Sequence, residues 1–270
     1  MTAEPPLLFE RRGAVALITL NRPARRNALS PELVCRLADA FDTLATDPAL
    51  RVAVLTGAGA QAFCSGGDLE LTLPLLSGAR TPQDDWDRRL LSGPETLARS
   101  TLKGEIGKPV IAAINGTCLA GGFEMMLGTD IRLAADHATF GLPEAQRGLI
   151  PFAGALVRLP RQVPQALAME WLLTGEAFDT EAARGAGLVN RVLPAADVLP
   201  AALDMADRIA ANGPLAIAEI KKTTAFASGR PLDDGFVQEA RSMATVMASE
   251  DAREGPAAFM ERRPPRYRGR

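Results

Sequence analysis

The sequence has little cysteine and histidine and no long hydrophobic run. Three cysteines and one histidine among 270 residues are too few, and too far apart, for a disulfide framework or a zinc site. The apolar runs fall short of the roughly 18 residues that a transmembrane helix needs. Residues 1–10 contain two prolines and two acids, whereas a secretory signal has a basic start and an apolar centre. We therefore expect a cytoplasmic protein without structural zinc.

An excess of positive charge is also missing. The formal net charge is −2, with 47% hydrophobic residues, which is typical of a globular protein rather than a disordered chain. Only four lysines are present, and nucleic-acid-binding proteins usually carry a strongly basic face. We expect neither a nucleic-acid nor a membrane partner. The exception is the end of the chain, where five arginines cluster: Arg262, Arg263, Arg266, Arg268 and Arg270.

The single histidine, His137, restricts the nucleophilic mechanisms open to this chain. Triads of the Ser-His-Asp and Cys-His kinds need a histidine base. His137 lies between Asp136 and Ala138, in a stretch typical of a turn before a short strand. We expect its side chain to be structural or to face solvent.

Short apolar runs alternate with helical patterns through the first two-thirds of the chain. Ser30 and Pro31 form an N-cap and a first helical residue ahead of leucines at helical spacing. The runs at 51–56 and 109–115 each lead into a glycine-rich loop, as parallel strands of an α/β fold do. Further strands are expected at 14–20, 130–134, 139–141 and 188–192, and helices at 165–174 and 180–186.

The pattern changes near residue 195. Residues 69–103 read as broken helix that forms a lid or a pocket wall, whereas the chain beyond 195 is almost entirely helical in pattern. We expect residues 1–195 to form an α/β core with the active site and residues 196–270 to form a helical C-terminal region. Its helices are expected at 198–211, 214–228, 232–248 and near Ala257.

Two glycine-containing loops are candidates for anion binding. Gly66 and Gly67 follow one expected strand, and Gly121 and Gly122 follow another. If each loop opens a helix, its backbone N–H groups can bind an anion or polarise a carbonyl as an oxyanion hole. The alternative is that both are only strand-to-helix turns.

Two glutamates lie beside expected helix starts. Glu124 is three residues beyond Gly121 in an apolar setting, and Glu144 follows Pro143. Each can interact with a helix dipole, or face a pocket where burial raises its pKa and suits it to acid–base work.

Five motifs in order resemble the enoyl-CoA hydratase/isomerase (crotonase) superfamily, over nearly the whole chain. The end of the chain, residues 254–263, fits the same family. The motifs are Asn21-Arg22-Pro23 with Arg26-Asn27-Ala28-Leu29, Phe63-Cys64-Ser65-Gly66-Gly67-Asp68, residues 108–116, Gly121-Gly122-Phe123-Glu124, and Phe140-Gly141-Leu142-Pro143-Glu144.

The resemblance implies a crotonase-type spiral of ββα units, followed by helices that mediate trimerisation, commonly as a dimer of trimers. It implies that the N–H groups of Gly67 and Gly121 form the oxyanion hole for an acyl-CoA thioester and stabilise an enolate. It also implies that Glu124 activates the water that attacks C3 while Glu144 delivers a proton to C2. The implied activity is that of an enoyl-CoA hydratase.

The resemblance also implies contacts with CoA, which is part of the substrate. No further cofactor is expected, because no GxGxxG opens a βαβ unit. Arginine suits phosphate through its bidentate fork, and a tail arginine, Arg262 or Arg263, would reach CoA from a neighbouring subunit, unless the tail is merely solvated. The remaining candidates for substrate or CoA contact are Arg26, Ala28, Ser65, Gly66, Asp68, Leu69, Pro143 and Phe259.

Departures from the usual hydratase pattern concern the acyl group. Residues 150–156 carry bulkier side chains than the glycine-rich run common in hydratases, and Ala120 stands where a third glycine is frequent. The tail from Ser249 resembles that of carnitinyl-CoA dehydratases, so a branched or polar acyl group is an alternative. Within the same chemistry the runners-up are an enoyl-CoA isomerase and a hydroxyacyl-CoA dehydratase. A non-catalytic CoA-binding protein is a rival from another class.

Overall fold

The computed structural model describes residues 4–104 and 106–270. Within them the strands form two sheets, one of order β1-β2-β3-β5-β7-β10 and one of order β4-β6-β8-β9. The strands are β1 (Leu7–Arg12), β2 (Val15–Leu20), β3 (Val52–Gly57), β4 (Ala62–Cys64), β5 (Val110–Ile114), β6 (Thr117–Leu119), β7 (Ile131–Ala135), β8 (Thr139–Gly141), β9 (Phe178–Asp179) and β10 (Arg191–Leu193). The helices are α1 (Pro31–Thr46), α2 (Thr72–Leu76), α3 (Asp85–Leu91), α4 (Pro94–Ser100), α5 (Gly121–Met126), α6 (Ala155–Gln162), α7 (Gln165–Thr174), α8 (Thr180–Gly185), α9 (Ala195–Ala210), α10 (Pro214–Ala227), α11 (Leu232–Met247) and α12 (Asp251–Met260).

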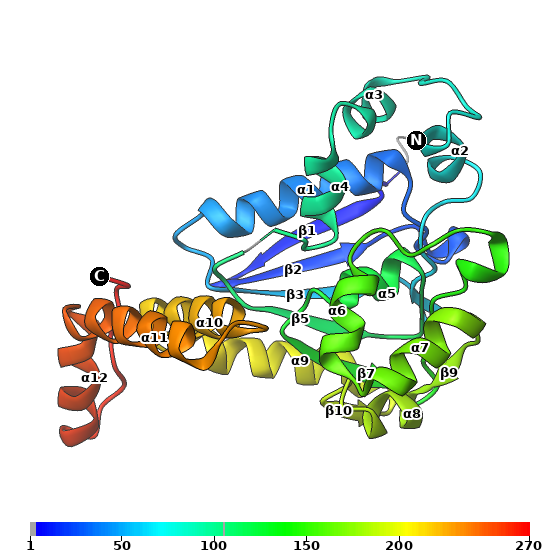
Figure 1. Cartoon of the computed structure of the whole chain (residues 1–270). Helices are drawn as coiled ribbons and strands as arrows, with labels where there is room; N and C mark the ends of the chain where they lie inside the picture. The colour runs from blue at the N-terminus through cyan, green and yellow to red at the C-terminus, as the bar shows by residue number, and fades with distance from the viewer. Residues whose placement is uncertain (1–3, 105) are drawn as a thin grey trace.

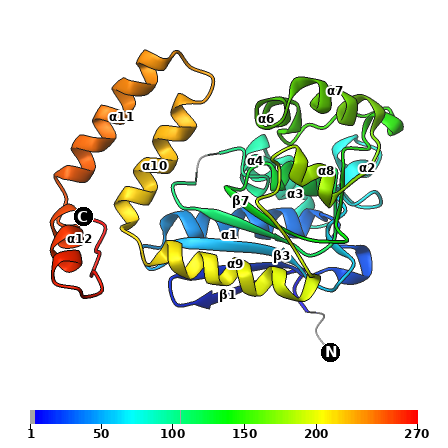
Figure 2. The same cartoon turned by 90° about the horizontal axis from the view of Figure 1, so that it is seen from below.

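The large sheet is covered on both faces, with α1 on one side and α9 on the other (Figures 1 and 2). Strands buried on both faces are expected to be continuous apolar runs rather than alternating ones, and β3 and β5 are buried along their whole lengths. The predicted cap of α1 is confirmed, since the Ser30 hydroxyl accepts a hydrogen bond from the N–H of Leu33.

Three strands of the small sheet, β4, β6 and β8, each follow a strand of the large one along the chain. The pairs β3–β4, β5–β6 and β7–β8 are each followed by a helical segment: α2, α5 and the 3-10 turn Ala145–Arg147. Because β4, β6 and β8 are parallel neighbours, the segments that follow them lie close together. This is the spiral of ββα units that the family resemblance implies, and it positions the candidate site.

One expectation about local structure is wrong, and the bounds of another are shifted. Gly67 does not open a helix, because it forms a bridge with Leu29 and α2 begins only at Thr72. The last expected strand, at 188–192, is present but begins three residues later, since β10 spans Arg191–Leu193. By contrast, Gly121 opens α5, as predicted.

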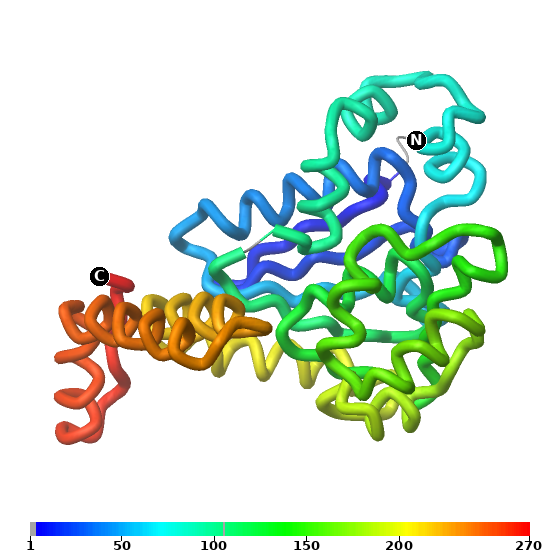
Figure 3. Tube along the Cα trace, viewed as in Figure 1, coloured from blue at the N-terminus to red at the C-terminus, as the bar shows by residue number. Residues whose placement is uncertain are grey.

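The C-terminal helices divide into two groups. Helix α9 packs on the large sheet, where Val198, Ala202 and Ala206 are buried in the main core. The chain therefore leaves the core after α9 rather than at residue 195. Helices α10, α11 and α12 project from the body as an arm (Figures 1 and 3).

A few polar contacts tie the arm to the core. Lys221 of α10 forms an ion pair of 2.7 Å with Asp130, and the Arg51 guanidinium donates to the carbonyls of Ala210 and Tyr267. In the described ranges, no helix combines the length and the apolar character needed to cross a membrane.

Candidate functional site

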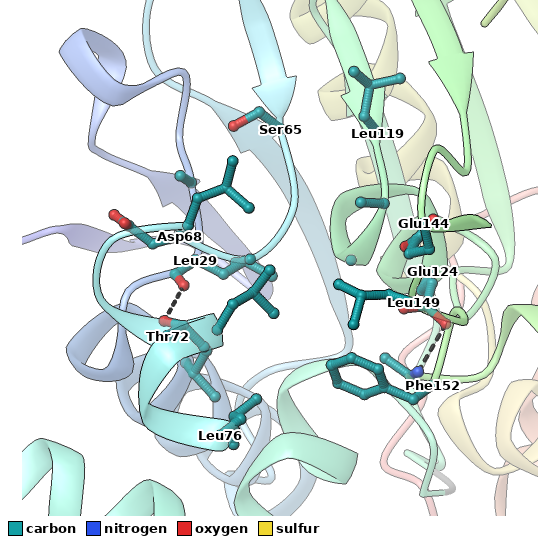
Figure 4. A pocket seen from close by; sticks show the side chains of 18 of the residues that line it. Leu29, Ser65, Asp68, Thr72, Leu76, Leu119, Glu124, Glu144, Leu149 and Phe152 are labelled. Carbon is teal, nitrogen blue, oxygen red and sulfur yellow. Dashed lines mark hydrogen bonds between the residues drawn. The ribbon is translucent and has the colours of Figure 1, made fainter. Parts of the chain in front are cut away.

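A pocket of about 410 Å³ lies among the segments that follow β4, β6 and β8, with α2 and α4 on its far side (Figure 4). Most of the residues that the sequence predicts for the site line it. These are Arg26, Ala28, Ser65, Gly67, Asp68, Leu69, Gly121, Glu124, Pro143 and Glu144. Gly66 is not a lining residue, although it lies against Ala120, which is one. Phe259 is on the exposed surface of α12, and Arg262 follows that helix in the arm.

The two predicted oxyanion-hole glycines face each other. A Cβ placed on Gly121 would lie 3.6 Å from the backbone nitrogen of Gly67. In the part of the chain that the structure describes, neither N–H group donates a hydrogen bond to the protein. Two unpaired N–H groups on one wall of a pocket are suited to bind a carbonyl oxygen on which negative charge develops.

The turn before α5 holds the backbone in a conformation that favours glycine. Ala120 has φ 49° and ψ −127°, a positive φ that side chains disfavour. Gly66 has φ +94°, and a Cβ on it would lie 2.5 Å from the Cβ of Ala120. Strain of this kind is found where surrounding structure fixes a functional geometry, and here it sets the direction of the Gly121 N–H.

Helix α5 packs closely against β4. A Cβ on Gly122 would lie 2.5 Å from the carbonyl oxygen of Cys64, so only glycine allows this approach. This close packing fixes the positions of the first N–H group of α5 and of the Glu124 carboxyl group one turn later.

Glu124 is buried, with 2% of its surface exposed. Its Oε1 accepts hydrogen bonds from the N–H groups of Ala153, at 2.7 Å, and Ala155, at 3.1 Å. Burial raises the pKa of Glu124 to about 7, with the negative charge of Glu144 acting in the same direction and the two N–H groups opposing the rise.

Glu144 lies beside Glu124 at the same end of the pocket (Figure 4). It precedes the 3-10 turn Ala145–Arg147, so its predicted place at a helix start is confirmed for a single turn. Among the described residues, the buried Oε2 atom of Glu144 has no hydrogen-bond partner, and burial raises the pKa of this carboxyl group as well. A buried oxygen without a partner is unfavourable unless a ligand or water satisfies it.

Asp68 positions the chain rather than offering a free carboxylate. It is 3% exposed and forms an ion pair of 2.9 Å with Arg22. Its other oxygen accepts from the N–H groups of Glu70 and Leu71. Burial alone would raise the pKa of Asp68, but the Arg22 guanidinium and the two N–H groups outweigh burial and lower it.

A buried asparagine shapes the segment that carries Arg26 and Ala28. Asn27 has φ 55°, a left-handed conformation that asparagine tolerates. Its amide donates to the carbonyls of Ala58 and Ala62, and its oxygen accepts from the N–H of Arg22. The family motif around Asn27 is therefore a folding motif as well as part of the pocket.

The far part of the pocket is apolar. Leu73 and Leu76 of α2 and Leu97 of α4 form one wall, so the predicted pocket wall within residues 69–103 is confirmed. Leu149 and Phe152 face them from the other side (Figure 4).

Reasoning from sequence missed several site residues. Arg25, Arg147 and Thr72 line the pocket, and the N–H groups of Ala153 and Ala155 hold Glu124. The small residues of 153–155 at the start of α6 were the available signal, since a helix start offers free N–H groups. His137 lies outside this pocket, where its ring is within 3.3 Å of the Ala60 carbonyl. Over the described ranges, no group of three or more histidine, cysteine or acidic residues could hold a metal ion.

Comparison with known proteins agrees with this geometry. Residues 10–270 match the family model described as enoyl-CoA hydratase/isomerase. The enoyl-CoA hydratase EchA19 of Mycobacterium tuberculosis is 40% identical over 98% of this chain and 97% of its own length. The carnitinyl-CoA dehydratase of Proteus mirabilis is 37% identical over 96% of this chain and 97% of its own.

Solved structures agree as well. The crystal structure of an enoyl-CoA hydratase from Mycobacterium tuberculosis superposes with a TM-score of 0.88 at 39% identity, covering 99% of this chain and all (100%) of the other. The fold, the order of the motifs and these matches over the full length lead to one assignment. The chain belongs to the enoyl-CoA hydratase/isomerase family.

Proposed function

We propose that this protein is an enoyl-CoA hydratase, which adds water reversibly across the 2,3 double bond of an enoyl-CoA thioester. The observation that carries the proposal is the pairing of two buried carboxyl groups with two unpaired N–H groups in one pocket. The hydratase name of a relative that is 40% identical over the full chain supports it.

The oxyanion hole supplies the electrostatic part of the proposed reaction. The N–H groups of Gly67 and Gly121 bind the thioester oxygen. As water attacks C3, the electrons of the double bond move toward C2 and that oxygen. Preorganised donors stabilise the resulting enolate, and losing one typically costs about 2.7–4 kcal/mol of transition-state stabilisation.

The two glutamates handle the protons. Glu124, held by two N–H groups, takes a proton from the attacking water, and Glu144 gives a proton to C2. Because burial raises the pKa of both carboxyl groups, the pair holds a shared proton more readily near neutral pH than two exposed carboxylates would. Acid, base and oxyanion donors are all side chains or backbone of this chain, so the proposed reaction needs only water besides the thioester.

The test follows the absorbance of the conjugated enoyl thioester. The wild type should hydrate crotonyl-CoA or a longer enoyl-CoA, and Glu144→Gln should lower kcat by about 10²–10⁴-fold, as expected for the loss of a general acid. Glu170→Gln, on the exposed face of α7, is the matched control. A Glu144→Gln variant as fast as the control would refute the proposal.

An isomerase of the same family is the second candidate. Moving a double bond from C3 to C2 needs one carboxyl group to shuttle one proton, so Glu124→Gln should leave it largely intact. Hydration should collapse in the same variant. If the protein binds CoA but catalyses neither hydration nor isomerisation, that result would favour a non-catalytic CoA-binding protein.

We also propose a homo-oligomer, a trimer or a dimer of trimers, that acts in the cytoplasm. The arm of α10, α11 and α12 supports the oligomer because it projects from the body with large apolar side chains exposed. In such an assembly Phe259 and Arg262 of one subunit would reach the CoA bound by another.

A further inference from the structure

Arg158 lies on α6, close to the N–H groups that hold Glu124. It follows Ala155, one of the two donors, by one helical turn, and it is partly buried. Its guanidinium donates to the carbonyl of Thr101 at 3.0 Å and also to the carbonyl of Leu102. Both acceptors are main-chain oxygens just after α4, so neither of them neutralises the positive charge.

The guanidinium also lies against backbone on two other sides. A Cβ on Gly154 would lie 3.2 Å from the Nη1 atom of Arg158, and a Cβ on Gly128, just after α5, would lie 2.9 Å from the same atom. Arg158 therefore contacts the segment 153–155 that holds Glu124 and the end of the helix that carries Glu124.

The charged side chains that act on Glu124 are Glu144, Lys103 and Arg158. The charge of Glu144 raises the pKa of Glu124, whereas that of Lys103 lowers it. Burial lowers the pKa of Arg158, and the negative charge of Glu124 opposes that fall. Because such an interaction is mutual, the positive charge of Arg158 favours the ionised form of Glu124.

A buried charge is unfavourable unless a group of opposite charge or several hydrogen bonds compensate it. For Arg158 the compensation comes from the two carbonyls and from the charge of Glu124. Arg158 is not among the described residues that line the pocket, so its influence on the reaction would pass through Glu124.

We propose that Arg158 is a positioning residue for Glu124, because its guanidinium fastens the segment 153–155 to the carbonyls that follow α4. This inference rests on the proposed hydratase function. In the reaction, Glu124 must be ionised to take a proton from water, and the fixed cation keeps it ionised at lower pH. Since both acceptors are main-chain oxygens, the bridge needs no particular side chain on α4.

The experiment measures kcat for hydration of crotonyl-CoA as a function of pH. Arg158→Gln should move the acid limb of the profile to higher pH by about one unit, so that kcat below the limb falls about tenfold. Arg161→Gln is the matched control, because Arg161 is exposed on the same helix and its Nη1 donates to the carbonyl of Val157 within that helix. It should leave the profile unchanged.

Arg158→Lys separates the charge from the fork of the guanidinium. An ammonium keeps the positive charge but does not present two donors in a fixed plane. The acid limb should stay at the wild-type pH, while kcat at the optimum should fall several-fold, by about 1 kcal/mol. An Arg158→Lys variant with wild-type kcat at the optimum would overturn the positioning role of the fork.

Lys103→Gln is a second test of the charge. Lys103 donates from Nζ to the carbonyl of Phe152 at 2.9 Å, and its removal leaves the contacts of Arg158 in place. The acid limb should move in the same direction as in Arg158→Gln, but less. If Arg158→Gln lowers kcat equally at every pH, and Arg158→Lys does not restore the loss, then Arg158 only stabilises the fold and the proposal is overturned.

A measurement without substrate separates this inference from the proposed function. No turnover of any enoyl-CoA by the wild type would refute the hydratase itself. The pKa of Glu124 can still be followed by ¹³C NMR of labelled carboxyl groups, with the signal assigned by its loss in Glu124→Gln. A pKa of Glu124 that is the same in Arg158→Gln and in the wild type would overturn the role of Arg158 alone.

Discussion

At the scale of single residues, Glu124 is buried and accepts two backbone hydrogen bonds. The amount by which its burial lowers the free energy of unfolding depends on pH. Its pKa is about 7 in the folded protein against an ordinary 4.5. Between these pH values the folded protein holds a proton that the unfolded chain has released. The free energy of unfolding therefore falls as pH rises through this window and is lowest above it.

Replacing Glu124 with glutamine should remove this cost. The amide oxygen of the new side chain can still accept both N–H bonds, so the variant should gain stability over the wild type as pH rises from about 4.5 to about 7, by up to about 3 kcal/mol. Denaturant unfolding at pH 5 and pH 8 measures the difference. Glu170→Gln is the control. A gain in the free energy of unfolding of Glu124→Gln that is equal at both pH values would contradict the raised pKa of Glu124.

Gly66 and Ala120 form a second residue-scale pair. Gly66→Ala should lower the free energy of unfolding by at least about 2 kcal/mol, because it adds both a strained φ and a contact of 2.5 Å with the Ala120 side chain. Ala120→Gly removes the contact but not the strain, so the double variant should recover part of the loss.

A double-mutant cycle of unfolding free energies measures this coupling. Strictly additive effects of Gly66→Ala and Ala120→Gly would mean that the loops do not touch as described. Hydration rates of the same variants should follow their stabilities, since both loops carry N–H groups of the proposed oxyanion hole.

At the scale of elements, the close packing of α5 against β4 links the fold to the geometry of the site. Gly122→Ala would place a methyl group 2.5 Å from the Cys64 carbonyl and push the helix away. We expect a loss of at least about 2 kcal/mol of stability and a fall in kcat larger than the fall in stability explains, because Gly121 and Glu124 move with the helix.

Gly185→Ala is the matched control for that variant. Gly185 ends α8, and a Cβ there would meet nothing within 4 Å, so helix propensity alone should make the variant neutral or slightly more stable. A Gly122→Ala variant that behaves like this control would show that α5 does not approach β4 as closely as described.

The elements also show what sequence patterns could and could not predict. The strands buried on both faces and the capped α1 were predicted, because continuous apolar runs and Ser-Pro caps are local signals. Strand β1 was missed because most of its side chains are partly or fully exposed. Strands β4 and β6 were missed because they lie within the stretches interpreted as glycine-rich loops.

For the site, the sequence and its family resemblance named both glutamates and both glycines. The resemblance was needed, because the glutamates are 20 residues apart in sequence and only the parallel order of β6 and β8 brings them together. The N–H donors of Ala153 and Ala155 could not be predicted, since any backbone can donate and only the tertiary path of residues 149–155 directs them at Glu124.

At the scale of the whole molecule, the arm exposes an apolar stripe. On α11, Leu232, Phe236, Met243 and Met247 recur on one face and are 60–77% exposed. Apolar patches on projecting helices usually mark protein interfaces, which supports the proposed oligomer of identical subunits.

Charging this stripe should dissociate the assembly. Phe236→Asp with Met243→Asp should reduce the mass measured by light scattering to that of one 28.6 kDa chain. KM should rise as well, because in the proposed assembly Phe259 and Arg262 contact the CoA bound by a neighbouring subunit. Leu173→Asp, on α7 outside the arm, should keep the wild-type mass. A wild type that is already monomeric would refute the oligomer.

The hydrogen bonds that the N–H groups of Ala153 and Ala155 donate to Glu124 have a consequence for protein engineering. The same short segment carries Leu149 and Phe152, so a mutation there that reshapes the apolar wall of the pocket also shifts the proposed catalytic base, Glu124. Libraries that seek new substrates should therefore randomise Leu76 and Leu97, which lie on helices that do not hold the carboxyl pair. Such libraries should retain more active clones than libraries built at 149–155.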